Sequence, residues 1–104
     1  MLILKGESGK GRIISEMLAK TNSICFTYSD YPVNCMTESY YVDSKNYSLD
    51  DLMLCITEHT ETYPERYYDY FIIYTNNKEE ELKDFIAWLK YVEYFSRNVL
   101  VTCR

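Results

Sequence analysis

The chain has 104 residues, 47 % of them hydrophobic, and a formal net charge of −5. This length suits one domain with one core, and the scarcity of glycine and proline argues against a linker or a disordered tail. An acidic chain without a basic patch is a poor binder of nucleic-acid backbones, so we expect a protein partner with a basic or apolar surface instead.

The first part of the chain predicts a strand, a glycine turn, a helix and further strands. Residues 1–4 are apolar and lead to a glycine, which predicts a buried strand that ends in a tight turn. Apolar residues then recur at helical spacing and predict a helix over 11–20. β-favouring residues predict a second strand over 23–28. Polar residues in 29–47 predict a loop that contains a short strand at 39–42.

The middle of the chain predicts a helix followed by the most apolar strand. Ser48 has the features of an N-cap, with Asp51 three positions on in a capping-box arrangement, and the helix should end before Pro64. Residues 69–75 are apolar at their centre, as in a strand that is covered on both faces. We expect this strand to be central in the sheet.

The last part predicts a third helix, capped by Asn76 or Asn77, and a closing strand over 98–103. The order β-α-β-(loop)-α-β-α-β predicts one small three-layer α/β domain over 1–104. Its sheet should be mainly parallel, with four to five strands, and about three helices should flank it on both faces through right-handed crossovers.

The cysteines and the single histidine restrict the chemistry. No signal-peptide or membrane-spanning stretch is visible, so we expect a cytoplasmic protein without a membrane partner. The four cysteines match no short metal or redox motif and are expected to be reduced, packed thiols. His59 is the only histidine, which argues against a zinc site or a histidine-based triad.

One motif carries chemistry. The segment from Gly6 to Ile13, Gly-Glu-Ser-Gly-Lys-Gly-Arg-Ile, follows a predicted strand and opens a predicted helix. It resembles the Walker A loop of the P-loop NTPases, G-x-x-x-x-G-K-[ST], whose glycine-rich backbone curls its N–H groups around phosphate. The resemblance implies binding of ATP, GTP or a phosphate or sulfate ion. It assigns this role to eight residues: Gly6, Glu7, Ser8, Gly9, Lys10, Gly11, Arg12 and Ile13.

The motif differs from the family pattern at the positions that bind phosphate and magnesium. Arg12 replaces the signature lysine, and Ile13 replaces the Ser or Thr whose hydroxyl binds magnesium in the family. A second register resembles the deviant Walker A loops, with Lys5 as the additional lysine and Lys10 in the G-K pair, but places Gly11 where the hydroxyl belongs. In either register the loop is degenerate, which predicts a pseudo-ATPase without efficient hydrolysis.

The acid that orders magnesium in the family, the Walker B acid, is also missing from its place. The strand over 69–75 ends in Thr75, and Asp69 stands at its opposite end. Asp30, just after the second strand, is the carboxylate best placed for a metal ligand, and a turn or capping aspartate is the alternative. Thr102 is similar to the polar residue that closes a later strand in one branch of the family.

Twelve tyrosines are present, and several of them cluster. They favour a contact surface for a partner, because tyrosine offers a large apolar face and a hydroxyl group at low entropic cost. The alternative is that they coat the sheet and its rim, and a homodimer would use the same surface. The candidate partner-binding residues are Tyr40, Tyr41, Tyr63, Tyr67 and Tyr68.

Three hypotheses of function follow. The first is a degenerate P-loop protein, encoded by a phage or mobile element, that acts as an inhibitor or adaptor by binding another protein. The second is a small nucleotide-binding module with weak ATPase or kinase-like activity. The third is an acidic mimic of DNA. The alternative for the motif itself is a tight glycine turn without a ligand.

Overall fold

Five parallel strands form one sheet in the computed structural model, which describes residues 1–6, 10–31 and 38–104, with the backbone alone at 10, 11, 17 and 18. The strands lie in the order β1-β5-β4-β2-β3. Their bounds are Leu2–Lys5 for β1, Ser23–Ser29 for β2, Ser39–Asp43 for β3, Tyr68–Thr75 for β4 and Ser96–Cys103 for β5. The parallel α/β architecture and the central place of β4 are therefore confirmed. The expectation of a buried first strand was wrong, because β1 lies at the edge of the sheet with Leu2 and Ile3 exposed.

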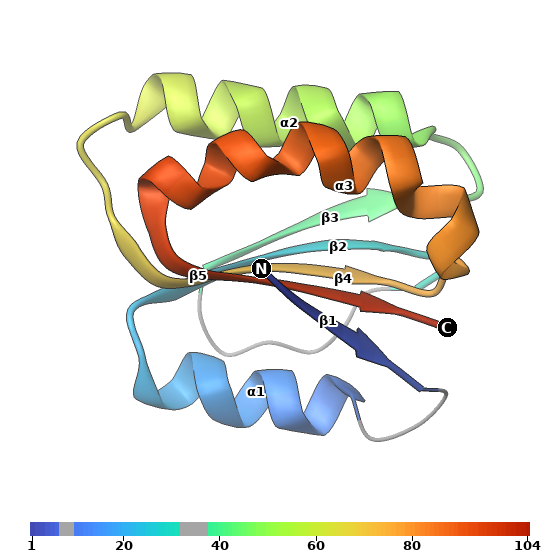
Figure 1. Ribbon diagram of the computed structural model, residues 1–104, viewed down its shortest axis with the longest axis horizontal. Coiled ribbons are helices and arrows are strands. Elements are labelled where there is room, and N and C mark those ends of the chain that lie inside the picture. The colour runs from blue at the N-terminus through green and yellow to red at the C-terminus, as the bar shows by residue number, and fades with distance from the viewer. Residues whose placement is uncertain (7–9, 32–37) are drawn as a thin grey trace.

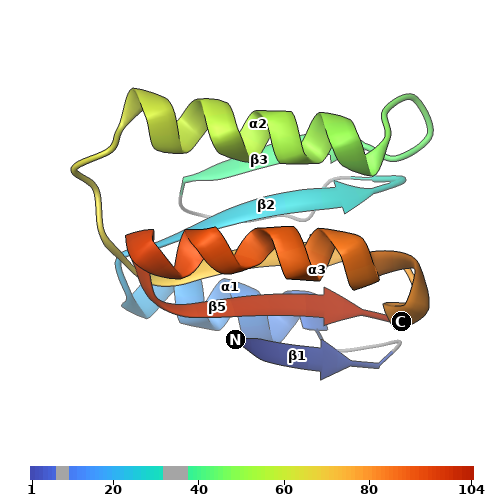
Figure 2. The ribbon, with the colours of Figure 1, turned by 45° about the horizontal axis from the view of Figure 1, so that its top comes forward.

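The helices cover both faces of the sheet, as predicted (Figures 1 and 2). Helix α1 (Lys10–Lys20) lies on one face, and α2 (Leu49–Thr62) and α3 (Lys83–Leu89) lie together on the other. None of the helices in the described part of the chain is long and apolar enough to cross a membrane.

Helix α2 begins where the sequence predicts. The Ser48 hydroxyl accepts the N–H of Asp51, and the Asp51 carboxylate accepts the N–H of Ser48 at 2.8 Å. This reciprocal capping box satisfies N–H groups that have no partner inside the helix. The helix ends at Thr62, before Pro64, because proline cannot continue it.

The third helical segment differs from the prediction. It consists of a 3-10 turn, η1 (Glu79–Leu82), then α3, then a second 3-10 stretch, η2 (Lys90–Phe95). Lys78 caps η1, so the expectation that Asn76 or Asn77 is the cap was wrong. Aromatic and β-branched residues crowd η2 and have low helix propensity, which accounts for the loss of regular α-helix there.

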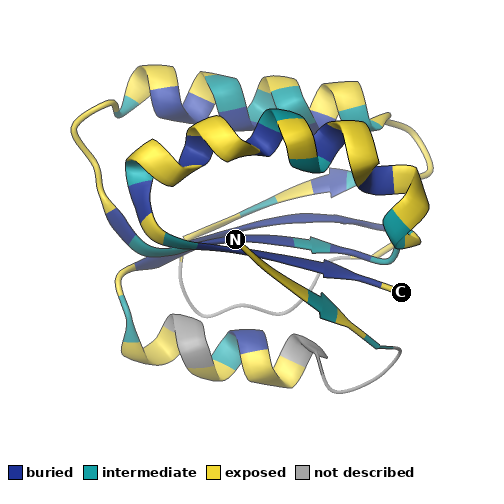
Figure 3. Cartoon of the chain, in the orientation of Figure 1, coloured by how far each residue is buried: buried dark blue, intermediate teal, exposed yellow. Residues whose placement is uncertain are grey.

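The core is divided by the sheet (Figure 3). The larger cluster lies between the sheet and the pair α2 and α3, and the smaller one lies under α1 around Ile14, Cys25, Ile72 and Leu100. The centre of β4 contributes to both clusters, and its residues 71–73 are fully buried. This rigid parallel sheet fixes where each strand ends, and so fixes the geometry of the site.

Candidate functional site

The carboxyl ends of the strands meet at one edge of the sheet, where a polar crevice of about 630 Å³ opens. Ligands of open α/β sheets bind at this edge. β1 leads to α1 on one face of the sheet, whereas β4 leads to α3 on the other, so the chain diverges around the crevice (Figure 1). Its lining residues are Gly6, Tyr28, Ser29, Asp30, Tyr31, Ser44, Asn76, Asn77, Glu81 and Arg104.

Gly6 follows β1 and forms one wall of the crevice. Its φ is +148°, a value that residues with a side chain rarely adopt, which explains the glycine. No heavy atom of the other described residues lies within 4 Å of the place where a Cβ would stand, so these residues leave the backbone open to close approach. The Gly6 N–H donates to the Cys103 carbonyl at 3.3 Å and ties this turn to β5.

Asp30 and Arg104 stand on opposite sides of the crevice. Asp30 follows β2, and its carboxylate accepts the Ser44 hydroxyl at 2.8 Å. Arg104 follows β5, where its N–H donates to the Asn77 carbonyl at 2.8 Å and its Nε donates to the Asn76 carbonyl at 3.3 Å. Because β4 lies between β2 and β5, the two charges are separated by about two strand spacings, roughly 10 Å. Neither of them forms a salt bridge within the described part of the chain.

A pair of threonines holds the ends of β4 and β5 together beneath the crevice. The Thr75 N–H donates to the Thr102 hydroxyl at 3.0 Å, and the Thr75 hydroxyl donates to the Thr102 carbonyl at 2.9 Å. Both side chains are fully buried. Thr102, singled out in the sequence as a sensor-like residue, therefore bonds to the backbone of β4, and it does not line the crevice.

The structure brings only part of the predicted loop to the crevice. Gly6 lines it, whereas Glu7, Ser8 and Gly9 lie outside the described residues, and Lys10 and Gly11 form the first turn of α1 with only their backbone described. Arg12 and Ile13 do not line the crevice, and the Arg12 guanidinium lies 3.5 Å from the Glu16 carboxylate, one turn further along α1.

Lys5, the additional lysine of the second register, is also engaged elsewhere. Its Nζ lies 2.6 Å from the Glu79 carboxylate, and this contact raises the pKa of Lys5 above its ordinary value. The described residues contain no group of three or more His, Cys, Asp or Glu side chains arranged to hold a metal ion. The metal role considered for Asp30 therefore stays a prediction without support from neighbouring ligands.

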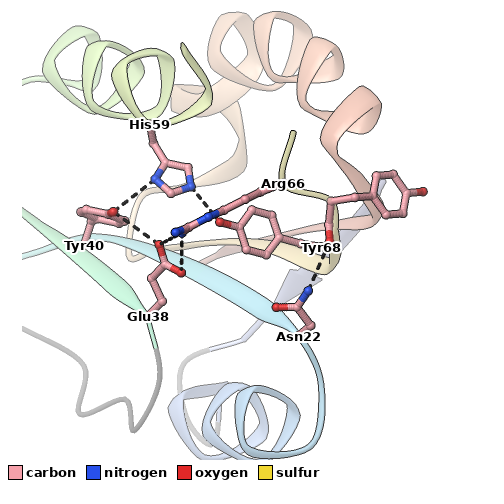
Figure 4. Close-up of polar contacts among 7 residues, drawn as sticks. Asn22, Glu38, Tyr40, His59, Arg66 and Tyr68 are labelled. Atoms are coloured by element: carbon pink, nitrogen blue, oxygen red, sulfur yellow. Dashed lines mark hydrogen bonds and ion pairs between the residues drawn. The ribbon is translucent and has the colours of Figure 1, made fainter. Parts of the chain in front are cut away.

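A second polar cluster lies at the opposite edge, where the strands begin, and the sequence did not reveal it (Figure 4). Buried His59 of α2 lies between two tyrosine hydroxyls, with Nε2 at 2.9 Å from Tyr68 and Nδ1 at 3.2 Å from Tyr40. The Tyr40 hydroxyl donates to Glu38, so it accepts from Nδ1–H, and the neutral ring then accepts the Tyr68 hydroxyl at Nε2. Burial lowers the pKa of His59 and favours this neutral form.

An ion pair closes that cluster toward solvent. The Arg66 guanidinium donates to both Glu38 carboxylate oxygens, at 3.1 and 3.3 Å, and its carbon lies 3.9 Å from the centre of the Tyr63 ring. The only sequence signal for this cluster is one histidine near many tyrosines, and their separation along the chain hides the contact.

The five tyrosines of the predicted contact surface have different environments. Tyr40, Tyr63 and Tyr68 belong to the cluster around His59, and Tyr68 is buried. Tyr41 and Tyr67 are exposed at separate places, on β3 and before β4. The structure thus divides the predicted set between a packed cluster and open surface.

Comparison with known proteins adds nothing to this geometry. No protein-family model, curated protein or solved structure matches the chain.

Proposed function

We propose that the carboxyl-edge crevice binds a phosphorylated small molecule of the nucleotide class, and that the protein does not hydrolyse it. One observation carries the proposal: Gly6, Asp30 and Arg104 follow three different strands and line one crevice. Its volume of about 630 Å³ is within the range of small-molecule sites.

The charges of the crevice suggest how such a ligand would lie. The backbone of Arg104 and its Nε are held by Asn76 and Asn77, so the terminal guanidinium nitrogens remain available for a phosphate group, which arginine binds in a fork geometry. Asp30 would accept hydroxyl groups of a sugar, about 10 Å away.

The same charges favour one phosphate over three. Asp30 and Glu81 place two carboxylates in the crevice against the single guanidinium of Arg104. A triphosphate brings about four negative charges and a monophosphate about two, so those carboxylates repel the monophosphate less, while the arginine can bind one phosphate group of either. We therefore expect a nucleoside monophosphate to bind more tightly than the triphosphate.

The residue types argue against hydrolysis. Ile13 occupies the position at which the P-loop family has a magnesium-binding hydroxyl, and its alkyl side chain cannot bind a metal. In addition, β4 ends in Thr75, and no acid follows it. Descent from that family is part of the proposal. It is supported by the order of strand, glycine turn and helix in a parallel sheet.

Isothermal titration calorimetry with AMP, ATP, adenosine and inorganic phosphate tests the proposal. We expect AMP to bind most tightly, and Arg104→Gln to weaken it at least tenfold. Arg97→Gln is the matched control, because it removes the same charge from an exposed position at the other end of β5. Equal weakening by both variants, or no binding at millimolar AMP, would overturn the proposal.

A second function, regulation of another protein by binding it, is favoured by a separate observation. Tyr41, Tyr47 and Leu54 are all more than 40 % exposed and line one groove beside an acidic helix face. An inhibitor or adaptor of a basic protein would present such a surface.

A further inference from the structure

β3 leaves one edge of the sheet open. Among the described residues it pairs only with β2, to which the Glu38 carbonyl and the Ser44 N–H both bond. Because backbone groups alternate in direction along a strand, those of the odd-numbered residues point away from β2. These residues are Ser39, Tyr41 and Asp43.

Most of those outward groups have no partner among the residues that the structure describes. The Asp43 carbonyl accepts two N–H groups from the turn that follows β3. In the described part of the chain, no backbone hydrogen bond is made by the outward N–H and carbonyl of Ser39 and Tyr41 or by the Asp43 N–H. Such groups form a template on which a further strand can pair.

A groove of about 320 Å³ runs between this edge and α2. Its helix side is a single stripe of α2 with i, i+3, i+4 and i+7 spacing: Asp51, Leu54, Cys55 and Glu58. Its strand side is formed by Tyr41, Val42 and Tyr47. A strand added to β3 would therefore lie against this stripe of α2, which runs above β3 in Figure 1.

The stripe has an apolar centre and an acid at each end. Leu54 is 57 % exposed although it is apolar, while Asp51 and Glu58 carry negative charge on either side of it. No lysine, arginine or histidine is among the groove-lining residues of the described chain. The pattern matches a partner with basic side chains that flank an apolar one, since lysine and arginine also lay their alkyl stems on apolar surface.

We propose that this groove binds an extended basic segment of another protein, which adds to β3 as a sixth strand. Positions 51 and 58 of α2 are about 10 Å apart along the helix, a distance that between two and four residues of an extended strand would span. The segment should therefore have the pattern basic-x-apolar-x-basic. This inference rests on the second proposed function, protein binding, and it does not involve the crevice.

The acids of the groove argue against a second copy of this chain as the occupant. In a twofold arrangement of two β3 edges, each groove would face the same acidic stripe of its partner. Like charges across an interface are repulsive. A separate, basic protein segment is the occupant that the charges favour.

The probe is a blocked seven-residue peptide in which lysine, valine and lysine alternate with threonine, titrated into the 15N-labelled full chain. We expect chemical-shift changes at 39–43 and along 51–58, and slower hydrogen exchange at the amides of Ser39 and Tyr41. The same peptide, N-methylated on the residues that face β3, should bind at least tenfold more weakly because it cannot donate to the edge.

Two charge variants distinguish binding of the peptide in the groove from its general attraction to an acidic protein. Glu58→Lys should weaken the peptide at least tenfold, whereas Glu80→Lys, with the same charge change on η1 outside the groove, should not. Glu58 is exposed on a helix that tolerates lysine, and Glu58→Gln serves if the first variant does not fold.

Equal weakening by the two lysine variants, or full binding of the N-methylated peptide, would overturn the strand addition. Shifts confined to other surfaces would overturn the groove while leaving the protein-binding function in place. No shift at any amide at millimolar peptide would contradict both.

Discussion

The Tyr68 hydroxyl lies 2.9 Å from Nε2 of His59, and both side chains are buried between α2 and β4. The neutral histidine ring accepts there while Tyr40 accepts from its other nitrogen. The contact joins a helix to the first residue of the central strand. It therefore ties the stability of the sheet to the protonation state of one ring.

Lowering the pH should destabilise the fold through His59. Burial lowers the pKa of His59 in the folded protein, although Glu38 opposes the shift. The unfolded chain therefore takes up the proton first, so the stabilisation is complete above the ordinary pKa and is lost as pH falls through that value toward the folded pKa. Urea unfolding between about pH 7.5 and about pH 5 measures the loss.

The variant His59→Gln isolates this contribution from that of the carboxylates. Its free energy of unfolding should fall less over the same pH interval than that of the wild type. An identical pH dependence in both proteins would show that His59 does not titrate as argued.

Removing the Tyr68 hydroxyl should destabilise the protein. In Tyr68→Phe, Nε2 of the buried ring loses its donor, and an unsatisfied buried polar atom costs about 1–3 kcal/mol. The neighbouring variant Tyr67→Phe is a matched control, because Tyr67 is 59 % exposed. Thermal and urea unfolding should therefore separate the two variants, and equal stability would contradict the hydrogen-bond assignment.

Gly6→Ala should destabilise the fold although space for the methyl group exists. None of the described residues has an atom within 4 Å of the new Cβ, so the cost comes from the φ of +148° and should be about 1–3 kcal/mol. The comparison is Ala87→Gly, an exposed helix position at which the cost should be about 1 kcal/mol or less. A fully stable Gly6→Ala protein would mean that the turn relaxes to ordinary backbone.

The fold was largely predictable because its elements have local signals. The capping box of Ser48 and Asp51 and the apolar centre of β4 act through neighbours in sequence, and both were placed correctly. The cap of the third helical segment was missed because asparagine is only a general preference at such positions.

The site was less predictable because it depends on the strand order. Only the observed order brings Gly6, Asp30 and Arg104 to one crevice, with β4 and β5 inserted between β1 and β2. In the sequence, His59 served only to argue against a zinc site or a histidine-based triad, and nothing there indicated its two tyrosine partners, which come from β3 and β4. Contacts between distant segments leave no periodic signal in the sequence.

Asp30→Asn should change which ligands bind the crevice. The carboxylate is expected to accept sugar hydroxyls, so AMP should bind several-fold more weakly to the variant while inorganic phosphate is unaffected or binds more tightly. Asp84→Asn, an exposed charge change on α3, is the control in the same calorimetric series. Equal effects of both variants on AMP would mean that Asp30 acts only through long-range charge.

The most direct test of the crevice as a binding site is a nuclear magnetic resonance titration of the 15N-labelled protein with AMP. The account predicts saturable shift changes at the amides of Gly6, Asp30, Asn77 and Arg104, which follow four different strands or their connections, with the amino-edge cluster around His59 unmoved. Shifts scattered over the surface, or none at millimolar AMP, would contradict it.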